Sequence, residues 1–126
     1  MSVREVVEIY IPEGSTWLYQ GVLRDETGAA IAAASLTTLT LTIYATGPGK
    51  PLVNAVDGTN ILNTGRGAVD ANGNLSITFL PADQALVIWN GANPEEHIAE
   101  VEWTWSAGAK AGKHEILFRV WDLAKA

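Results

Sequence analysis

The sequence contains no cysteine. A disulfide framework and a thiolate metal site are therefore excluded, and the fold must be held together by packing alone. With 126 residues, 48% of them hydrophobic, the chain is long enough for one compact core and too short for two ordinary domains. We expect a single domain over residues 1–126, in which residues 1–12 form an edge strand or an assembly arm.

Basic residues are few, and long apolar runs are missing. Eight Lys and Arg stand against fourteen Asp and Glu, which gives a net charge of −6 with no basic cluster. Such a chain repels phosphate groups, so we expect no nucleic-acid partner. No segment approaches the roughly 20 apolar residues of a membrane span, and the charged start lacks the apolar run of a secretory signal. We therefore expect neither a membrane partner nor export.

The dominant pattern in the chain is an alternation with period two. In residues 39–44 (LTLTIY), leucine and isoleucine alternate with threonine and tyrosine, as a half-buried strand requires. This pattern places Leu39, Leu41 and Ile43 on the core face. Segments rich in β-branched and aromatic residues recur at 5–11, 16–23, 74–80, 97–106 and 114–123. The sequence therefore predicts a protein built from short strands.

Turn signals separate these segments. Residues 25–28 (DETG) predict a tight turn, and further turns are expected at 47–49, 57–58, 72–73 and 90–91. The alanines at 29–34 are too few for a stable helix and predict an irregular crossing. Residues 81–86, which begin with Pro81, predict one short helix or turn. About seven strands at this spacing predict an all-β, immunoglobulin-like antiparallel sandwich, with a small barrel as the alternative.

The last two strands form a hairpin whose face pattern restricts its register. Ala99, Val101, Trp103 and Trp105 alternate with charged and polar residues on the first strand. On the second strand, Ile116, Phe118 and Val120 alternate with Leu117, Arg119 and Trp121. Gathering the large side chains pairs Trp103 with Phe118, Val101 with Val120 and Trp105 with Ile116. This register predicts a loop over residues 107–113 and places Glu102 opposite Arg119.

The two histidines are the most tempting site for a metal or a general base, because each adjoins a glutamate. The predicted register places His114 beside Ala107 and separates it from His97 by roughly 30 Å. Each is therefore interpreted as a surface histidine at a strand end. Ser35, Ser76 and Ser106 lack the strand-turn-helix context of a nucleophile elbow. We expect no catalysis, no cofactor and no metal.

The tryptophans at 17, 89, 103, 105 and 121 are the unusual feature of the composition. Alternation places Trp103 and Trp105 in the core, and core burial is also the commoner fate of a large aromatic side chain. Trp17 and Trp121 are the better surface candidates. An exposed row of aromatic rings would stack on sugars, so a carbohydrate-binding module with a glycan partner remains the alternative function.

Several segments carry a family resemblance. Residues 94–123 (PEEHIAEVEWTWSAGAKAGKHEILFRVWDL) resemble the C-terminal hairpin of small structural proteins of tailed bacteriophages. Residues 23–44, 57–64 and 70–86 are similar to the same group, so the likeness covers about residues 22–123. The strand-turn opening also resembles the N-terminal immunoglobulin-like domain of phage baseplate adaptor proteins. The resemblance implies a non-enzymatic virion component, and it supplies no catalytic residues.

We therefore expect a structural or adaptor subunit at the head surface, neck or tail of a phage particle. Its partners would be other virion proteins in an oligomeric assembly, and it would join the virion in the host cytoplasm. The N-terminal segment has apolar residues on both faces, including Val6 and Tyr10, with Pro12 only at its end. Because an unprotected edge strand invites contact, we expect Val6, Tyr10, Trp17 and Trp121 to bind partners, by strand addition or apolar packing.

Overall fold

The computed structural model describes residues 2–47, 49–62, 64, 66–85, 94–106 and 108–121. These residues form eight strands and two short 3-10 helices. The strands are β1 (Ser2–Pro12), β2 (Trp17–Val22), β3 (Leu36–Ala45), β4 (Thr59–Asn60), β5 (Gly67–Val69), β6 (Asn74–Phe79), β7 (Glu95–Trp105) and β8 (Lys110–Trp121). Trp89, the turn expected at 90–91 and the last residues of the final strand lie outside the described residues.

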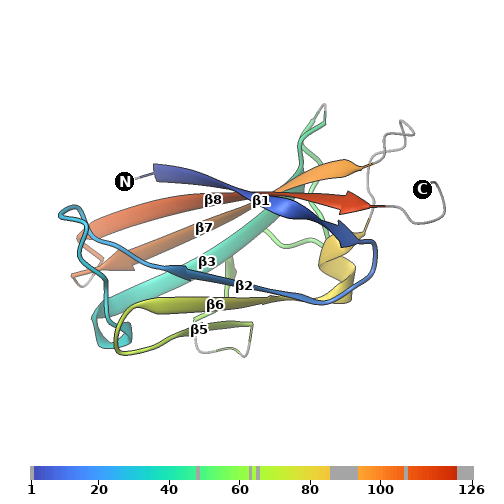
Figure 1. Ribbon diagram of the computed structural model, residues 1–126. Helices are drawn as coiled ribbons and strands as arrows, with labels where there is room; N and C mark the ends of the chain where they lie inside the picture. The colour runs from blue at the N-terminus through green and yellow to red at the C-terminus, as the bar shows by residue number, and fades with distance from the viewer. Residues whose placement is uncertain are drawn as a thin grey trace.

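Two sheets form the layers of a β-sandwich (Figure 1). The five-stranded sheet has the order β1-β8-β7-β3-β4, and the three-stranded sheet has the order β2-β6-β5. If β2 to β8 are lettered B, C, C′, D, E, F and G, these orders become G-F-C-C′ and B-E-D, as in immunoglobulin domains. The predicted all-β, immunoglobulin-like sandwich is confirmed.

The first strand departs from the antiparallel prediction. β1 pairs in parallel with β8, from Ser2 opposite Lys113 to Pro12 opposite Trp121. All other pairs between the described strands are antiparallel. As a result, the first and last strands of the described chain lie side by side, and β1 is an edge strand of the larger sheet.

The connectors follow the turn chemistry of the sequence. Asp25 accepts backbone hydrogen bonds from Thr27 and Ala29, and Gly28 has a φ of +87°, so residues 25–28 form the predicted turn. The alanine segment crosses between the sheets with a single 3-10 turn at Ala33–Ser35. A second 3-10 turn, Pro81–Gln84, begins at the predicted proline. β4 and β5 were not predicted, because two or three residues are too few for a periodic signal.

The core lies between the two sheets and contains the residues that alternation predicted. Leu39, Leu41 and Ile43 on β3 are fully buried, and Trp103 and Trp105 on β7 are 6% and 8% exposed. The opposite sheet contributes its own buried side chains: Tyr19, Leu75, Ile77 and Phe79. The predicted core faces of β3, β7 and β8 are therefore confirmed.

The register predicted for the β7–β8 hairpin is wrong. Trp103 lies opposite Gly112 instead of Phe118, and Phe118 lies opposite His97. The loop is correspondingly shorter, since β8 already begins at Lys110. The indole of Trp103 covers Gly112 so closely that a Cβ there would lie 2.6 Å from the ring. A large side chain over a glycine, and not two large side chains together, fills this part of the core.

Candidate functional site

The outer face of the β1–β8 strand pair brings together three of the four residues expected to bind partners. Val6 lies opposite Leu117, Tyr10 opposite Arg119, and Pro12 opposite Trp121. All of these side chains lie on the outer face of the five-stranded sheet, because Ile116, Phe118 and Val120 occupy the inner face of β8. Val6 is 42% exposed and Tyr10 is 54% exposed, so both side chains are open to solvent.

The aromatic rings of Tyr10 and Trp121 are in contact across this pair of strands. Their centroids lie 5.1 Å apart, with the ring planes tilted by 42°. Together with Val6, Leu117 and Arg119, they form a continuous surface that we call the β1–β8 patch. The patch borders the unpaired edge of β1. Sequence reasoning missed Leu117 and Arg119, although their alternation with the buried residues of β8 placed them on this face.

Trp17 lies apart from the patch. It begins β2 in the other sheet, and its ring stacks on Phe79 with centroids 4.4 Å apart and planes 7° from parallel. Its ring also approaches Phe118 at 5.2 Å, and its indole N–H donates to Gln84 Oε1 at 3.3 Å. The structure therefore places Trp17 in the contact between the two sheets, with only part of its side chain exposed.

A bulge interrupts the edge of β1. Between Val6 and Tyr10 the strand advances four residues while β8 advances two, from Leu117 to Arg119. Bulges of this kind distort an edge and oppose the addition of a further strand. Of the two modes of contact expected for this segment, the geometry therefore favours packing of exposed side chains over strand addition.

Polar contacts on the inner side of β1 fasten it to the other sheet. The Tyr19 hydroxyl donates to Glu5 Oε1 at 2.8 Å, and His114 Nε2 lies 3.1 Å from that hydroxyl and 3.3 Å from the same carboxylate oxygen. Burial, together with the adjacent Glu5 carboxylate, raises the pKa of Tyr19 well above its usual range. This cluster joins β1, β2 and β8, so β1 is tied into the sandwich of its own chain.

His97 is buried, which contradicts its interpretation as a surface histidine. Its side chain has no exposed surface, and its Nε2 lies 2.7 Å from Glu95 Oε1, which is also buried. Its ring packs edge-on against Phe118 at 5.5 Å. Burial lowers the pKa of His97, and the bond to Glu95 opposes that effect only in part. This pair lies within the core.

His114 lies closer to His97 than the predicted register allowed. His114 pairs with Val101 and His97 with Phe118, so four strand residues, roughly 13 Å, separate them along the hairpin. Both side chains lie on the inner face, where Ala99 and Ile116 stand between them. To bind one metal ion together, each ring would need a nitrogen about 2 Å from that ion. The two rings are therefore not placed to share a metal ion. Among the described residues, no group of three or more His, Asp and Glu is placed to hold a metal.

A second buried polar cluster is organised by Asp83, which is fully buried at the 3-10 turn after β6. Its carboxylate accepts hydrogen bonds from Asn54 Nδ2 at 3.0 Å and from the Leu80 backbone N–H at 2.7 Å, and it pairs with Arg66. These contacts pin three separate loops to one carboxylate. The Leu80 N–H at the start of the turn gains a hydrogen-bond acceptor in this way. The three partners of Asp83 also offset the cost of burying its carboxylate.

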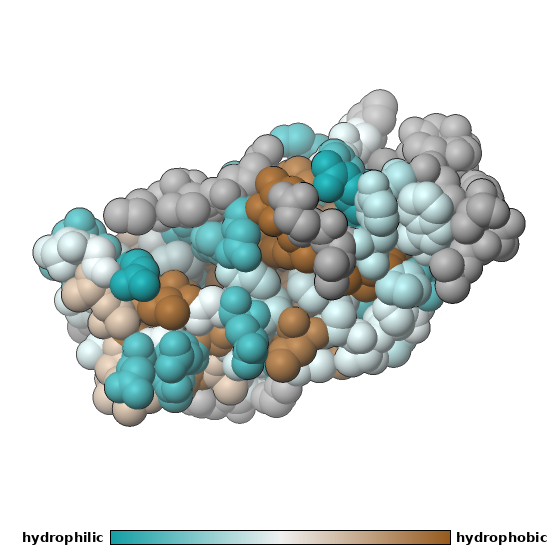
Figure 2. Space-filling view, in the orientation of Figure 1, coloured by the Kyte–Doolittle hydropathy of each residue, from teal (hydrophilic) through white to brown (hydrophobic). Residues whose placement is uncertain are grey.

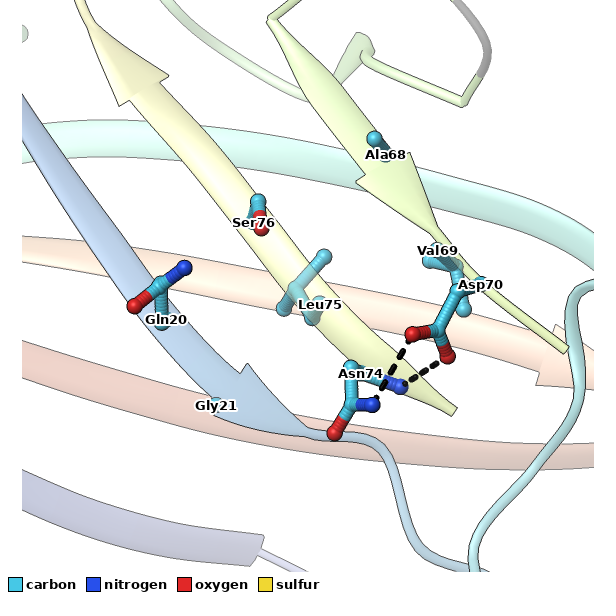
Figure 3. A pocket seen from close by; sticks show the side chains of 8 residues that line it. All are labelled: Gln20, Gly21, Ala68, Val69, Asp70, Asn74, Leu75 and Ser76. Carbon is cyan, nitrogen blue, oxygen red and sulfur yellow. Dashed lines mark hydrogen bonds between the residues drawn. The ribbon is translucent and has the colours of Figure 1, made fainter. Parts of the chain in front are cut away.

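The outer face of the three-stranded sheet has a shallow hollow of about 460 Å³ (Figure 3). The side chains in it are small or uncharged except for Asp70, whose carboxylate accepts bonds from the Asn72 and Asn74 backbone and from the Asn74 side chain. The bond from the Asn74 side chain, followed by those from the two backbone groups, lowers the pKa of Asp70, and together they hold the predicted turn around residues 72–73. The other lining residues are Gln20, Gly21, Ala68, Val69, Leu75 and Ser76. The hollow therefore offers neither a nucleophile with a base nor an aromatic platform.

Comparisons with known proteins assign no family to the chain. No family model matches the sequence, and no curated protein matches it. One solved structure with a match is a family 123 glycoside hydrolase from Clostridium perfringens, studied for the hydrolysis of glycolipid glycans. It is 15% identical with a TM-score of 0.34, and the match covers 97% of this chain but only 23% of the hydrolase. A likeness this distant carries no argument about function.

Proposed function

We propose that the chain is a non-enzymatic structural or adaptor subunit of a tailed-phage particle and works through protein–protein contacts. The sequence resemblance over about residues 22–123 suggests the particle. The observation that carries the contact role is the β1–β8 patch, where Val6, Tyr10 and Trp121 meet on one face. Under this proposal, the chain resides in the virion after assembly in the host cytoplasm.

The composition of the patch supports a binding role. Tyrosine, tryptophan and arginine are the residue types that most often dominate the energy of protein interfaces. Tyr10, Trp121 and Arg119 place all three types side by side, with Val6 and Leu117 as apolar neighbours. In Figure 2, apolar side chains reach the surface in separate patches along the side of the sandwich where β1 and β2 run. The β1–β8 patch is instead one contiguous group, and contiguous apolar groups with polar neighbours are typical of contact surfaces.

The carbohydrate-binding alternative finds less support in the described residues. Trp103 and Trp105 are buried, and Trp17 stacks against Phe79 between the sheets. The rings of Tyr10 and Trp121 are tilted against each other, whereas a sugar platform needs coplanar rings. No observation on the described part of the chain therefore favours a glycan ligand over a protein partner.

The proposal is tested by quantitative mass spectrometry of purified particles produced with the wild-type chain or with single variants. Tyr10→Ser is the informative variant, and Leu18→Ser is its matched control, since these side chains are 54% and 55% exposed. We expect normal incorporation of the control and incorporation reduced by about tenfold for Tyr10→Ser, the loss of one hot-spot aromatic. Absence of the wild-type chain from purified particles would refute the virion role.

Point variants are preferable to removal of the N-terminal segment. Ile11 is 2% exposed, and β1 pairs with β8 from Ser2 to Pro12. Deletion of residues 1–12 would therefore strip a strand from the five-stranded sheet, and we expect the truncated chain to lose its fold. A truncated chain that folds would show that β1 is dispensable for the sandwich, and its incorporation would then test β1 as an anchor directly.

A further inference from the structure

The two halves of β1 are attached to the rest of the sandwich in different ways. β1 pairs with β8 over residues 2–6 and again over residues 10–12, and the bulge between these stretches divides the strand. The second half has an anchor in the core, because Ile11 is 2% exposed. The turn after it adds a hydrogen bond from the Glu13 backbone N–H to the Trp121 carbonyl at 2.9 Å. Residues 10–12 are therefore fixed both in the core and at their end.

The first half has a polar attachment at Glu5. Of its described side chains, Val6 faces outward and Glu5 faces the other sheet. The Tyr19 hydroxyl and His114 Nε2 lie 2.8 and 3.3 Å from Glu5 Oε1. The Glu5 side chain is nevertheless 47% exposed, so water competes for its carboxylate. The described contact between residues 2–6 and β2 is therefore polar and lies at the boundary with solvent.

The side chains that receive the Glu5 carboxylate are held in place by their neighbours. Tyr19 is 6% exposed, and burial together with Glu5 raises its pKa well above its usual range, so the hydroxyl stays protonated and remains a donor. The hydroxyl lies over Gly21, where a Cβ would be only 2.6 Å from it. The ring of His114 lies beside that of Tyr19, with centroids 6.2 Å apart. The glycine at position 21 therefore leaves the space in which the hydroxyl meets the carboxylate.

We propose that residues 2–6 form a hinged half-strand that opens at the bulge, and that the contact of Glu5 with Tyr19 and His114 holds it closed. We call this contact the Glu5 latch. Local opening of an edge segment, with the remaining fold intact, is a common transition in proteins. A hydrogen bond to a charged group is strong enough to shift such an equilibrium by about tenfold. Loss of the latch therefore opens residues 2–6, while Ile11 keeps residues 10–12 in the core.

Opening of the half-strand changes the β1–β8 patch. In the closed state Val6 lies opposite Leu117 and completes the apolar part of the patch. In the open state Val6 leaves this surface, whereas Tyr10 and Trp121 keep their contact because both lie beyond the bulge. The inference rests on the proposed function and describes the regulation of its contact surface. A partner that covers Val6 binds the closed state and stabilises it.

Hydrogen exchange of backbone amides, followed residue by residue by NMR on the intact chain, tests the latch. Glu5→Gln replaces the charged acceptor with a neutral one, and Tyr19→Phe removes the donor. In both variants we expect the amides of residues 2–6 that are protected in the wild-type chain to exchange about tenfold faster. The Ile11 amide and the amides of β6 should change far less. The two effects should not add in the double variant, because both substitutions weaken the same contact.

A third variant and two matched controls make the test specific. Gly21→Ala displaces the Tyr19 hydroxyl without altering a member of the latch, so we expect it to speed exchange in residues 2–6 as Tyr19→Phe does. Glu26→Gln is the control for Glu5→Gln, because the two side chains are 52% and 47% exposed and each lies beside a Lys or His. Tyr10→Phe, in the second half of the same strand, is the control for Tyr19→Phe. Both controls should leave exchange in residues 2–6 unchanged.

Three results would overturn the inference. The first is a lack of protection at residues 2–6 in the wild-type chain, since no closed state would then exist to be held. The second is an equal rise of exchange along the whole of β1, which would make the contact an ordinary stabilising one. The third is an equal effect of the variants and their controls. If exchange responds as expected but the chain is absent from particles, the latch stands and the virion role fails. If the chain is present in particles but exchange does not respond, the latch alone fails.

Discussion

The outer faces of the two sheets differ, although each sheet exposes two large apolar side chains to a similar degree. On the five-stranded sheet these are Tyr10 and Val6, at 54% and 42%, and on the three-stranded sheet they are Leu18 and Val22, at 55% and 40%. Leu18 and Val22 are separated by Gln20, beside a hollow whose lining residues are small or uncharged except for Asp70. Tyr10 and Val6 instead adjoin Trp121, Leu117 and Arg119.

The exposed fraction alone therefore does not distinguish the two outer faces, whereas the neighbouring side chains do. Single apolar side chains on a surface are normal, whereas a contiguous group with aromatic and charged neighbours is not. The two inner faces, in contrast, meet in one core. Phe118 of the larger sheet contacts the rings of Trp17 and Phe79 from the smaller sheet. Changes inside should therefore destabilise both sheets together, and changes outside should affect contacts more than stability.

The largest effect is expected from Phe118→Ala. The side chain is fully buried where the two sheets meet, so its loss leaves a cavity between them. We expect the free energy of unfolding to fall by roughly 3–5 kcal/mol. Denaturant melts followed by tryptophan fluorescence and by far-ultraviolet circular dichroism should show one coincident transition. Two separate transitions would show that the sheets unfold independently, which would contradict the single core shared by the two inner faces.

A smaller loss is expected from Gly112→Ala. A Cβ at this position would lie 2.6 Å from the indole of Trp103, which is packed in the core and has little freedom to move. We expect a destabilisation of about 1–3 kcal/mol, as overpacking of a core usually produces. Ala111→Ser, one residue earlier on the exposed face, is the control and should be nearly neutral. Equal melting midpoints for both variants would contradict the observed β7–β8 register.

The buried His97 predicts a pH dependence of stability. Its folded-state pKa lies below the ordinary value of 6.5, so below that pH the unfolded chain binds the proton more readily. The stabilisation is complete above about pH 6.5 and is lost as the pH falls toward the folded-state pKa, by at most about 1.4 kcal/mol per pH unit. Denaturant melts from pH 7.5 to 5 test this. His97→Gln, which can still donate to Glu95, should lack this part of the slope, and an unchanged slope would contradict the prediction.

The smallest effect is expected from Arg119→Ala on the outer face. Its guanidinium is about one-third exposed, and its pair with Glu96 is a surface contact at 3.4 Å. Such pairs contribute about 1 kcal/mol or less to stability. Thr78→Ala on the outer face of the other sheet is the control. A loss from Arg119→Ala as large as that from Phe118→Ala would show that this outer face stabilises the fold as a core does.

The β7–β8 hairpin shows that a periodic pattern can predict the faces of a strand without predicting its register. Its faces were predicted correctly, yet its register was wrong by six positions. An even shift leaves every side chain on the same face, so alternation cannot detect it. The turn decides between such registers: Ser106 and Gly108 adopt positive φ of 55° and 87° and close a tight loop. The predicted contact between Glu102 and Arg119 failed with the register, and Lys113 and Glu96 are their observed partners.

His97 illustrates a conflict between the alternation of buried residues and the polarity of a single side chain. His97 continues the inward alternation of Ala99 and Val101, a pattern that by itself favours burial. It was interpreted instead as a surface histidine at a strand end. The structure reconciles the two, because Glu95 on the same strand and the same face provides a partner for the buried imidazole. The role of Glu95 as this partner can be recognised only once the tertiary structure shows that the inner face of β7 is buried at this end.

The amino-acid sequence by itself determined the fold class, the core faces, the turns at residues 25–28 and 72–73, and the acidic net charge. These properties depend on local residue types and on their periodicity along the chain. Only the tertiary structure decided that Val6, Tyr10 and Trp121 lie together and that Trp17 does not join them. Their grouping requires the parallel pairing of β1 with β8, two strands from opposite ends of the chain, and local pattern does not encode a contact over that separation.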